Sequence, residues 1–256
     1  MEIKAMEMEY LKIGNGSKTM VILPGFSLRP ISDDPAPIID SHQIFVDEFT
    51  VYLIDRRSDI EEGYTLYQMA EDTVTKLKEL GLKDIYLYGI SQGGMLAQLI
   101  AINRPELIKK MVLASTTGRS KNISLDLETI FEAIKDYDVT KIVDTFCSSI
   151  YSKEFYAKYR RYYVSTFSDL TEEELHHFEI IAKSIDEFDN YAELEKVNIP
   201  TLVLGSKKDK IIDYHEMEEL AKALRGEIYL YDEYDHGVNV EASDFKQRIK
   251  TFFMGV

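Results

Sequence analysis

The stretch that decides the fold is Ile85-Tyr86-Leu87-Tyr88-Gly89-Ile90-Ser91-Gln92-Gly93-Gly94. It begins as an apolar and aromatic run typical of a buried strand, and a helical pattern follows directly after it. Between the two lies Gly89-Ile90-Ser91-Gln92-Gly93, which fits the pattern G-x-S-x-G of a sharp strand-to-helix turn that exposes a serine hydroxyl. The alternative is a glycine-rich turn with an ordinary serine, so the interpretation depends on the partners that the chain offers to Ser91.

A serine hydroxyl is a weak nucleophile at neutral pH unless a base takes its proton. If Ser91 is a nucleophile, the chain must supply that base, an acid that orients it, and N–H donors for an oxyanion. Where a serine lies on this kind of turn, the acid and then the histidine follow it along the chain. We therefore expect both partners downstream of Ser91.

Strand and helix patterns alternate around this stretch, which predicts a mostly parallel sheet flanked by helices. Short apolar runs predict strands over residues 6–13, 19–23, 50–54, 85–89, 108–114, 201–205 and 227–231. Amphipathic patterns predict helices over residues 65–81, 93–103, 214–224 and 243–253, the first of them opened by a capping box at Thr65 and Gln68. Three prolines in residues 27–42 indicate a loop there.

The alternation is interrupted once, by a block that carries helical patterns only. Helices are predicted there over residues 126–137, 140–151, 153–166 and 172–186. Strand patterns resume at residue 201. The chain therefore reads as a core domain of residues 1–120 and 192–256, into which a helical cap of residues 121–191 is inserted.

Composition excludes several classes of partner. Acidic residues outnumber basic ones by 45 to 30 in a chain of 256 residues, and the formal net charge is −15. This balance argues against nucleic acid or an anionic membrane as the main partner. The single cysteine, Cys147, cannot form an internal disulfide or a thiolate metal site, and its apolar helical surroundings indicate a core residue.

The ends of the chain and its apolar runs bear on its location. The first residues, Met1 to Glu7, are charged and lack the apolar core of a signal peptide. No apolar run approaches the ~18 residues that a membrane span needs. We therefore expect a cytoplasmic protein, either a monomer or a homodimer, that acts on a small-molecule substrate.

His236 is the candidate base, because it follows the last predicted strand and comes after Ser91 in the chain. Loops at the carboxyl ends of parallel strands are where α/β sheets place their ligand and catalytic sites. His176 and His177 are adjacent on a cap helix and point to different faces, so they do not form a metal pair. Surface positions explain His42 and His215.

Two aspartates follow the strand at 201–205 and compete for the role of the acid. Asp213 has another use, because Asp213 and Glu216 have the spacing of a helix capping box. Asp209 lies in the loop with no such use and is the first choice, with Asp213 as the alternative. Asp232 and Asp235 are too near the candidate histidine in sequence to come from a separate loop.

The oxyanion donors should be two backbone N–H groups. One is expected from the residue after the nucleophile, Gln92, and the other from the loop after an early strand. That loop is Pro24-Gly25-Phe26. Proline has no N–H, so Phe26 is the candidate donor, and Gly25 permits a tight turn before it. A plain Pro-Gly turn is the alternative.

With these residues together, the sequence resembles the α/β-hydrolase-fold superfamily, and within it the serine hydrolases that carry an inserted helical cap. The resemblance spans nearly the whole chain and rests on five segments in family order: Pro24-Gly25-Phe26, Asp55-Arg56, Gly89 to Gly94, Gly205 to Asp209 and Asp235-His236-Gly237. It implies an eight-stranded, mostly parallel sheet, a Ser-His-Asp triad, and neither cofactor nor metal. The chain departs from the family at Pro24, where many members have histidine before the glycine.

Since the fold hosts many chemistries, the function must come from the site. Epoxide hydrolases and haloalkane dehalogenases of this fold use an aspartate where this chain has Ser91, so both are excluded. We expect a carboxylic-ester hydrolase that forms an acyl-enzyme with a small to medium, largely apolar acyl group. The alternatives are a carbon–carbon bond hydrolase or aminopeptidase on the same triad, and a ligand-binding regulatory protein with slow turnover.

The predicted cap is rich in aromatic residues. Most of them have the helical spacing of a cap core, and a few are expected to line an apolar acyl pocket. Four basic residues form a cluster in the cap: Lys153, Lys158, Arg160 and Arg161. A solvated helix face explains this cluster better than attraction of an anionic substrate does.

Overall fold

Seven strands form one sheet in the computed structural model, which describes residues 8–255. The order across the sheet is β1-β3-β2-β4-β5-β6-β7. Only the pairing of β1 with β3 is antiparallel. The strands are β1 (Met8–Ile13), β2 (Lys18–Leu23), β3 (Phe49–Arg57), β4 (Ile85–Ile90), β5 (Ile108–Ala114), β6 (Thr201–Ser206) and β7 (Glu227–Tyr231). Each coincides with an apolar run that predicted it, except that residues 6 and 7 of the first predicted strand lie outside the described residues.

The eight strands implied by the family resemblance are wrong for residues 8–255. A single strand, β1, forms the antiparallel edge of the sheet, and the chain then turns at Gly14 to Gly16 directly into β2. Gly14 has a φ of 75°, a conformation that favours glycine and lets the chain reverse within a few residues. No stretch between β1 and β2 is left to form a further strand.

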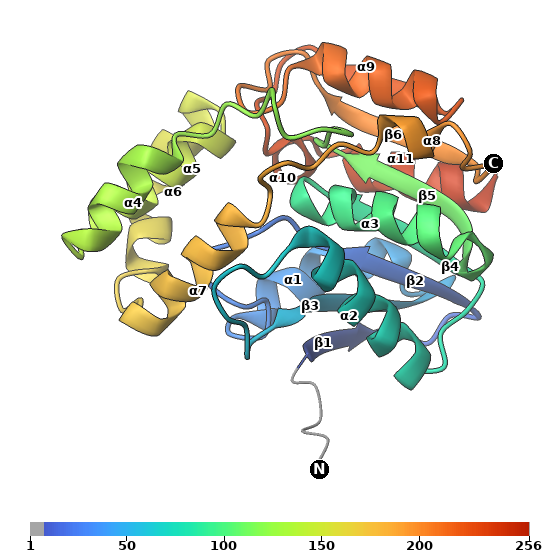
Figure 1. Cartoon of the computed structure of the whole chain (residues 1–256), viewed down its shortest axis with the longest axis horizontal. Coiled ribbons are helices and arrows are strands. Elements are labelled where there is room, and N and C mark those ends of the chain that lie inside the picture. The colour runs from blue at the N-terminus through green and yellow to red at the C-terminus, as the bar shows by residue number, and fades with distance from the viewer. Residues whose placement is uncertain (1–7, 256) are drawn as a thin grey trace.

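Helices cover both faces of the sheet (Figure 1). On one face, α2, α3 and α9 pack over a large apolar core, and on the other, α11 packs with the 3₁₀ turn η1 (Gln43–Phe45). Apart from four helices described below, the helices are α1 (Pro35–Ser41), α2 (Leu66–Glu79), α3 (Gln92–Asn103), α8 (Tyr191–Leu194), α9 (Tyr214–Ala223), α10 (Val238–Glu241) and α11 (Phe245–Met254), with a 3₁₀ turn η2 (Pro105–Leu107). Because the helices cover the two faces of the sheet, the loops that connect strands and helices lie at the ends of the strands.

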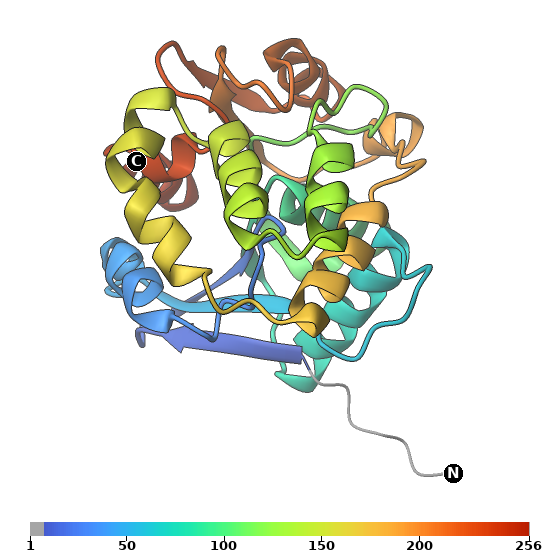
Figure 2. The ribbon, with the colours of Figure 1, turned by 90° about the vertical axis from the view of Figure 1, so that its left-hand side faces the viewer.

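Four helices between β5 and β6 lie together at one side of the sheet, at the left of Figure 1 and facing the viewer in Figure 2. They are α4 (Leu127–Lys135), α5 (Val139–Ile150), α6 (Lys153–Thr166) and α7 (Glu172–Lys183), each within three residues of its predicted bounds. They enclose an apolar core of their own around Phe146 and Phe178, which also contains Cys147. Burial raises the pKa of the Cys147 thiol to about 12, as suits a packing residue.

The loop predicted over residues 27–42 contains the helix α1. Pro35 occupies its first turn, where the missing N–H is not needed and the fixed φ suits a helix. His42 follows this helix and is buried, which contradicts the surface position expected from the sequence. Its Nδ1 lies 2.7 Å from the carbonyl oxygen of Ile38, so a backbone acceptor compensates for the loss of water.

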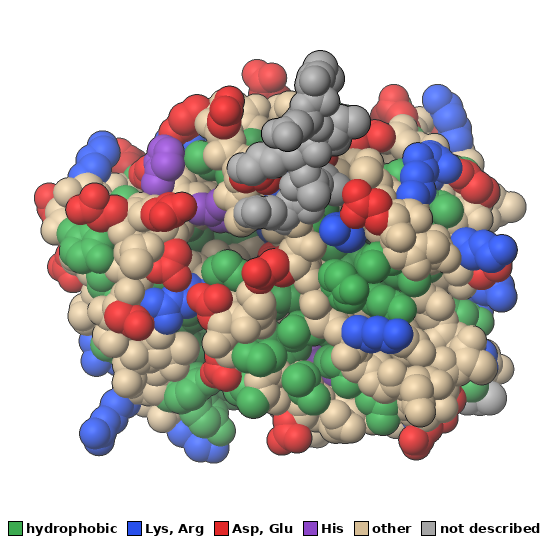
Figure 3. All heavy atoms as spheres, turned by 90° about the horizontal axis from the view of Figure 1, so that it is seen from below, with side chains coloured by type: hydrophobic (Ala, Val, Ile, Leu, Met, Phe, Trp, Pro, Cys, Tyr) green, Lys and Arg blue, Asp and Glu red, His purple; other side chains and the backbone are tan. Residues whose placement is uncertain are grey.

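Charged side chains of both signs lie on the face of the molecule drawn in Figure 3. Figure 3 shows acidic side chains scattered among basic and apolar ones over the face that it draws. Within residues 8–255, no helix is both long and apolar enough to cross a membrane.

Candidate active site

The candidate residues come from loops that follow different strands of the sheet. Ser91 follows β4, Asp209 follows β6, and His236 follows β7. Because these strands are parallel, their carboxyl ends lie at one edge of the sheet, and the loops meet there. Residues 145 and 27 positions apart in the chain are thereby brought into hydrogen-bonding contact.

Ser91 lies on a strained turn between β4 and α3. Its φ of 50° and ψ of −120° are conformations that an L-residue rarely adopts, and its N–H donates to the Ala114 carbonyl at 2.8 Å. The turn requires glycine nearby: a methyl group at Gly93 would lie 2.1 Å from the Leu23 carbonyl oxygen. The sharp turn therefore depends on both the neighbouring strand β2 and the absence of a side chain at Gly93.

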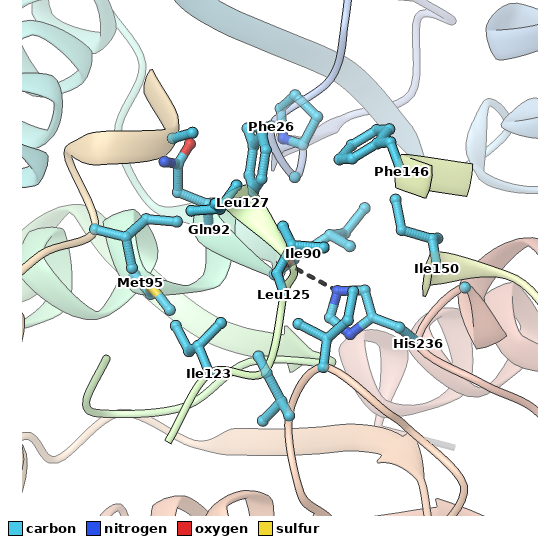
Figure 4. A pocket seen from close by; sticks show the side chains of 18 of the residues that line it. Phe26, Ile90, Gln92, Met95, Ile123, Leu125, Leu127, Phe146, Ile150 and His236 are labelled. Atoms are coloured by element: carbon cyan, nitrogen blue, oxygen red, sulfur yellow. Dashed lines mark hydrogen bonds between the residues drawn. The ribbon is translucent and has the colours of Figure 1, made fainter. Parts of the chain in front are cut away.

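Three side chains form a continuous chain of hydrogen bonds. The Nε2 of His236 is 3.0 Å from the Ser91 Oγ, a contact drawn as the dashed line in Figure 4, and its Nδ1 is 2.8 Å from the Asp209 Oδ2. A carboxylate only accepts hydrogen bonds, so Nδ1 carries the hydrogen and Nε2 is free to accept from the serine. This arrangement lets the imidazole take a proton from the Ser91 hydroxyl while the carboxylate stabilises the resulting imidazolium.

Asp209 is held in place from its other side. Its Oδ1 accepts hydrogen bonds from the N–H groups of Ile211 and Ile212, both at 2.9 Å, and its carboxylate is fully buried. The Ser115 hydroxyl donates to the backbone carbonyl of His236 at 3.0 Å and holds the histidine loop. The orientation of the two partners is thus set by backbone groups as well as by each other.

The other aspartates lie elsewhere. Asp213 is exposed at the N-terminus of α9, where it accepts from the N–H of His215 at 2.9 Å. Asp232 pairs with Lys207 at 2.8 Å, and Asp235 pairs with Lys210 at 2.6 Å. Among the remaining histidines, His177 lies 2.9 Å from a backbone carbonyl of β3. The hydrogen-bond partner of the Ser91 hydroxyl is His236, and none of these three aspartates nor His177 takes that place.

The two candidate oxyanion donors flank Ser91. A methyl group at Gly25 would be 3.4 Å from the Cβ of Ser91, so the loop that carries Phe26 runs beside the serine. Gln92 begins α3 directly after it. Within residues 8–255, no protein acceptor takes the backbone hydrogen of Phe26 or Gln92. Both N–H groups can therefore donate to a bound substrate oxygen.

Sequence reasoning missed the part that Arg56 plays around this site. Its guanidinium is buried and donates to the carbonyl oxygens of Pro24 at 2.8 Å and Gly25 at 3.2 Å, and to the Gln92 side chain at 2.8 Å. Burial lowers the pKa of Arg56, and the neighbouring Asp55 carboxylate opposes that shift. The sequence contained one signal, the Asp55-Arg56 pair at the end of a predicted strand. That pair supported the family resemblance, but it did not predict which groups Arg56 contacts.

A pocket of about 440 Å³ opens at Ser91 and His236. Figure 4 shows apolar side chains from the loops and from the helices between β5 and β6 pointing into it. Its walls include Phe26, Met95, Ile123, Leu125, Leu127, Phe146, Ile150, Ile185, Ile211 and Ile212, with Lys121, Asp186 and Asn239 as polar members. Such a cavity suits an apolar group of a few carbon atoms.

The described residues were also compared with the requirements of a metal site. No group of three histidine, cysteine, aspartate or glutamate side chains in residues 8–255 is arranged to hold a metal ion.

The sheet order, its helical layers and the serine at the turn after β4 define an α/β hydrolase. More closely, the chain belongs to the family described as serine aminopeptidase, S33, whose family model matches residues 49–243.

Known proteins similar to this chain agree with that class. Serine hydrolase BPHL of Mus musculus is 24% identical, over 98% of this chain and 84% of its own length. The crystal structure of MGS-M2, an alpha/beta hydrolase enzyme from a Medee basin deep-sea metagenome library, has a TM-score of 0.84 and 24% identity, and covers 98% of this chain and 95% of its own. The enol-lactonase from Burkholderia xenovorans LB400 has a TM-score of 0.80 and 19% identity, with 96% of each chain covered. The chain is therefore an α/β hydrolase.

Proposed function

We propose that this protein is a serine hydrolase that cleaves a carboxylic ester with a small to medium, largely apolar acyl group. The observation that carries the proposal is the hydrogen-bonded chain of Ser91, His236 and Asp209 at the mouth of an apolar pocket. In this proposal Ser91 is the nucleophile, His236 the general base, and Asp209 the acid that orients it.

The reaction follows from these positions in two halves. The Nε2 of His236 takes the hydroxyl proton while the Ser91 Oγ attacks the ester carbonyl carbon, and the oxyanion accepts hydrogen bonds from the N–H groups of Phe26 and Gln92. The C–O bond to the alcohol then breaks, and His236 returns its proton to the leaving oxygen. A water molecule repeats the sequence on the acyl-enzyme, releasing the carboxylic acid and free Ser91.

The proposal assigns the roof of the pocket to residues 121–191 as a cap on the core formed by residues 1–120 and 192–256. Leu127, Phe146 and Ile150 support this assignment, because they come from cap helices and line the pocket with Ser91. The cytoplasmic location and the monomeric or homodimeric state stay predictions from the sequence.

An aminopeptidase on the same three residues is the second candidate, because the family takes its name from that activity and the exposed Asp186 lies among the pocket residues. A carboxylate at this position could bind a substrate ammonium group. The apolar character of the other walls favours the ester, as does the likeness to an enol-lactonase, since a lactone is a cyclic ester.

The test compares p-nitrophenyl butyrate with amino-acid p-nitroanilides and a panel of diketones, for the wild type and Ser91→Ala. Hydrolysis of the butyrate that disappears in Ser91→Ala, with a fluorophosphonate label mapped to Ser91, is the expected result. Ester hydrolysis that survives the substitution would refute the proposal. Faster cleavage of the anilides would indicate an aminopeptidase, and faster cleavage of the diketones a carbon–carbon bond hydrolase. Slow turnover with tight ligand binding would favour a regulatory protein.

A further inference from the structure

Two side chains at the end of β3, Asp55 and Arg56, form hydrogen bonds with the loop that carries Phe26. At the start of the loop, Arg56 Nη2 donates to the Pro24 carbonyl at 2.8 Å and Nη1 donates to the Gly25 carbonyl at 3.2 Å. Further along, the Asp55 Oδ2 accepts from the N–H of Ile31 at 2.7 Å. Two adjacent side chains of β3 therefore restrain the loop between β2 and α1, which Arg29 also ties to Asp169 and Glu174.

The contact with Gly25 determines where a different group points. The Gly25 carbonyl and the Phe26 N–H belong to one planar peptide unit, and in a trans peptide they point in opposite directions. The described residues contain no cis peptide bond. A guanidinium that holds the Gly25 oxygen on one side therefore directs the Phe26 N–H to the other side, away from Arg56. It also withdraws electron density from the carbonyl and strengthens the N–H as a donor.

The Arg56 guanidinium also contacts Gln92, the residue that carries the second candidate oxyanion donor. Its Nε and Nη2 donate to the Gln92 Oε1 at 3.1 and 2.8 Å, and the Gln92 Nε2 donates to the Ile181 carbonyl in α7 at 2.9 Å. Figure 4 shows the Gln92 side chain extending away from His236. One buried cation thus joins the loop of Phe26, the turn of Ser91 and a helix of the cap.

The two peptide units differ in how they are held. The Ser91 carbonyl, which shares its peptide with the Gln92 N–H, accepts from the Thr116 hydroxyl at 2.8 Å and also from the Gly94 N–H at 2.8 Å. Within residues 8–255, Arg56 is the only protein donor to the Gly25 carbonyl. The backbone N–H of Met95 also donates to the Ser91 carbonyl, at 3.3 Å. The orientation of the Gly25 carbonyl therefore depends on one donor residue, whereas the Ser91 carbonyl has three donors.

We propose that Arg56 is a positioning residue of the oxyanion site: it orients the Phe26 N–H through the Gly25 carbonyl and ties this donor to Gln92 and α7. The proposal rests on the proposed function, since it assumes that an oxyanion forms beside Ser91. Arg56 is not among the residues that line the pocket, so its effect must come through the geometry of Phe26.

The test measures kcat and KM for p-nitrophenyl butyrate and Ki for butylboronic acid, whose tetrahedral serine adduct places an oxygen at the oxyanion position. Loss of one oxyanion donor lowers kcat by about 10²- to 10³-fold, so its misorientation in Arg56→Met should lower kcat by about 10- to 100-fold. KM should stay within about twofold, and Ki should rise by a factor similar to the loss in kcat. Thr116→Val should lower kcat by less than about fivefold, because Gly94 still holds the Ser91 carbonyl.

A second variant, Arg56→Lys, tests the proposal even if Arg56→Met does not fold. It retains the charge but lacks the planar fork, so it should fold and show an intermediate loss of kcat with unchanged KM. The matched control is Arg57→Met, because Arg57 pairs with Asp59 and Asp72 and not with the loop. It should keep kcat, KM and Ki near those of the wild type.

Two results separate this inference from the proposed function. If folded Arg56→Lys and Arg56→Met keep full kcat and Ki while Ser91→Ala is inactive, the positioning role is wrong and the proposed function stands. A change in KM alone would also overturn it, because it would indicate a role in binding and not in oxyanion stabilisation. If Ser91→Ala retains the ester activity, the proposed function itself fails.

Discussion

Replacing Asp209 by asparagine should inactivate the enzyme while leaving its fold intact. The Asp209 Oδ1 accepts from two backbone N–H groups, those of Ile211 and Ile212, at 2.9 Å. In Asp209→Asn the amide oxygen must take that place, because an NH₂ group there would face two donors. The NH₂ group then faces His236 Nδ1, which must lose its hydrogen to accept the bond. The hydrogen moves to Nε2, and Nε2 can no longer take the proton of Ser91.

The size of the effect follows from this change of tautomer. The corresponding substitution in a Ser-His-Asp triad lowers kcat by about 10⁴-fold, or about 5.4 kcal/mol of transition-state stabilisation. We expect a loss of that order in Asp209→Asn, measured as kcat for p-nitrophenyl butyrate at pH 7.5. Thermal unfolding should change little, because the buried backbone donors keep an acceptor.

Asp213→Asn is the matched control, since Asp213 is the other aspartate of the same loop. It accepts from the N–H of His215 at the start of α9 and is exposed. Asparagine is also a good N-cap, so kcat should stay within about twofold and stability within about 1 kcal/mol. A loss of less than about tenfold in Asp209→Asn, or an equal loss in Asp213→Asn, would refute the reasoning.

Three further outcomes follow from the structure. Ser91→Gly should be at least about 1 kcal/mol more stable in urea unfolding than Ser91→Ala, because only glycine relaxes a φ of 50°; equal stability would contradict the strain. Burial lowers the pKa of His42 from 6.5 to about 4, so its protonation favours the unfolded chain. Stability should therefore fall by about 3 kcal/mol between pH 6.5 and 4, and His42→Asn should flatten that slope in denaturant titrations, whereas an unchanged slope would exclude His42 as its source. Leu127→Ala enlarges the apolar pocket and should shift the best acyl chain by one or two carbons, at about fourfold in kcat/KM per methylene; an unshifted p-nitrophenyl ester series would place Leu127 outside the acyl site.

The regular parts of the fold could be predicted because their signals are local. Each strand from β1 to β7 is a short apolar run, and the buried faces of the helices repeat at helical spacing. The family resemblance was less accurate than the residue patterns in one respect, since it implied an eighth strand where the patterns supported seven. The helix α1 was missed because its prolines lie at its first turn, where they favour a helix, and not within it.

The candidate site shows the limit of sequence reasoning more clearly. The order of Ser91, Asp209 and His236 and their places after strands follow from the sequence, because a motif and a strand end are both local features. The choice between Asp209 and Asp213 rested on a capping pattern, and the structure adds the distances that join Asp209 to His236 and place Asp213 on α9.

By itself, the sequence determined the strand-rich core, the helical insertion and the serine turn, because backbone preferences and apolar periodicity act over a few residues. Only the tertiary structure decided that His42 is buried, which residues line the apolar pocket, and that Arg56 holds the carbonyl of Gly25. These features depend on contacts between segments far apart in the chain, whose distances are set by the packing of the sheet. The serine turn itself combines both levels: Gly93 is visible in the sequence, but the Leu23 carbonyl that makes a side chain there impossible comes from the neighbouring strand.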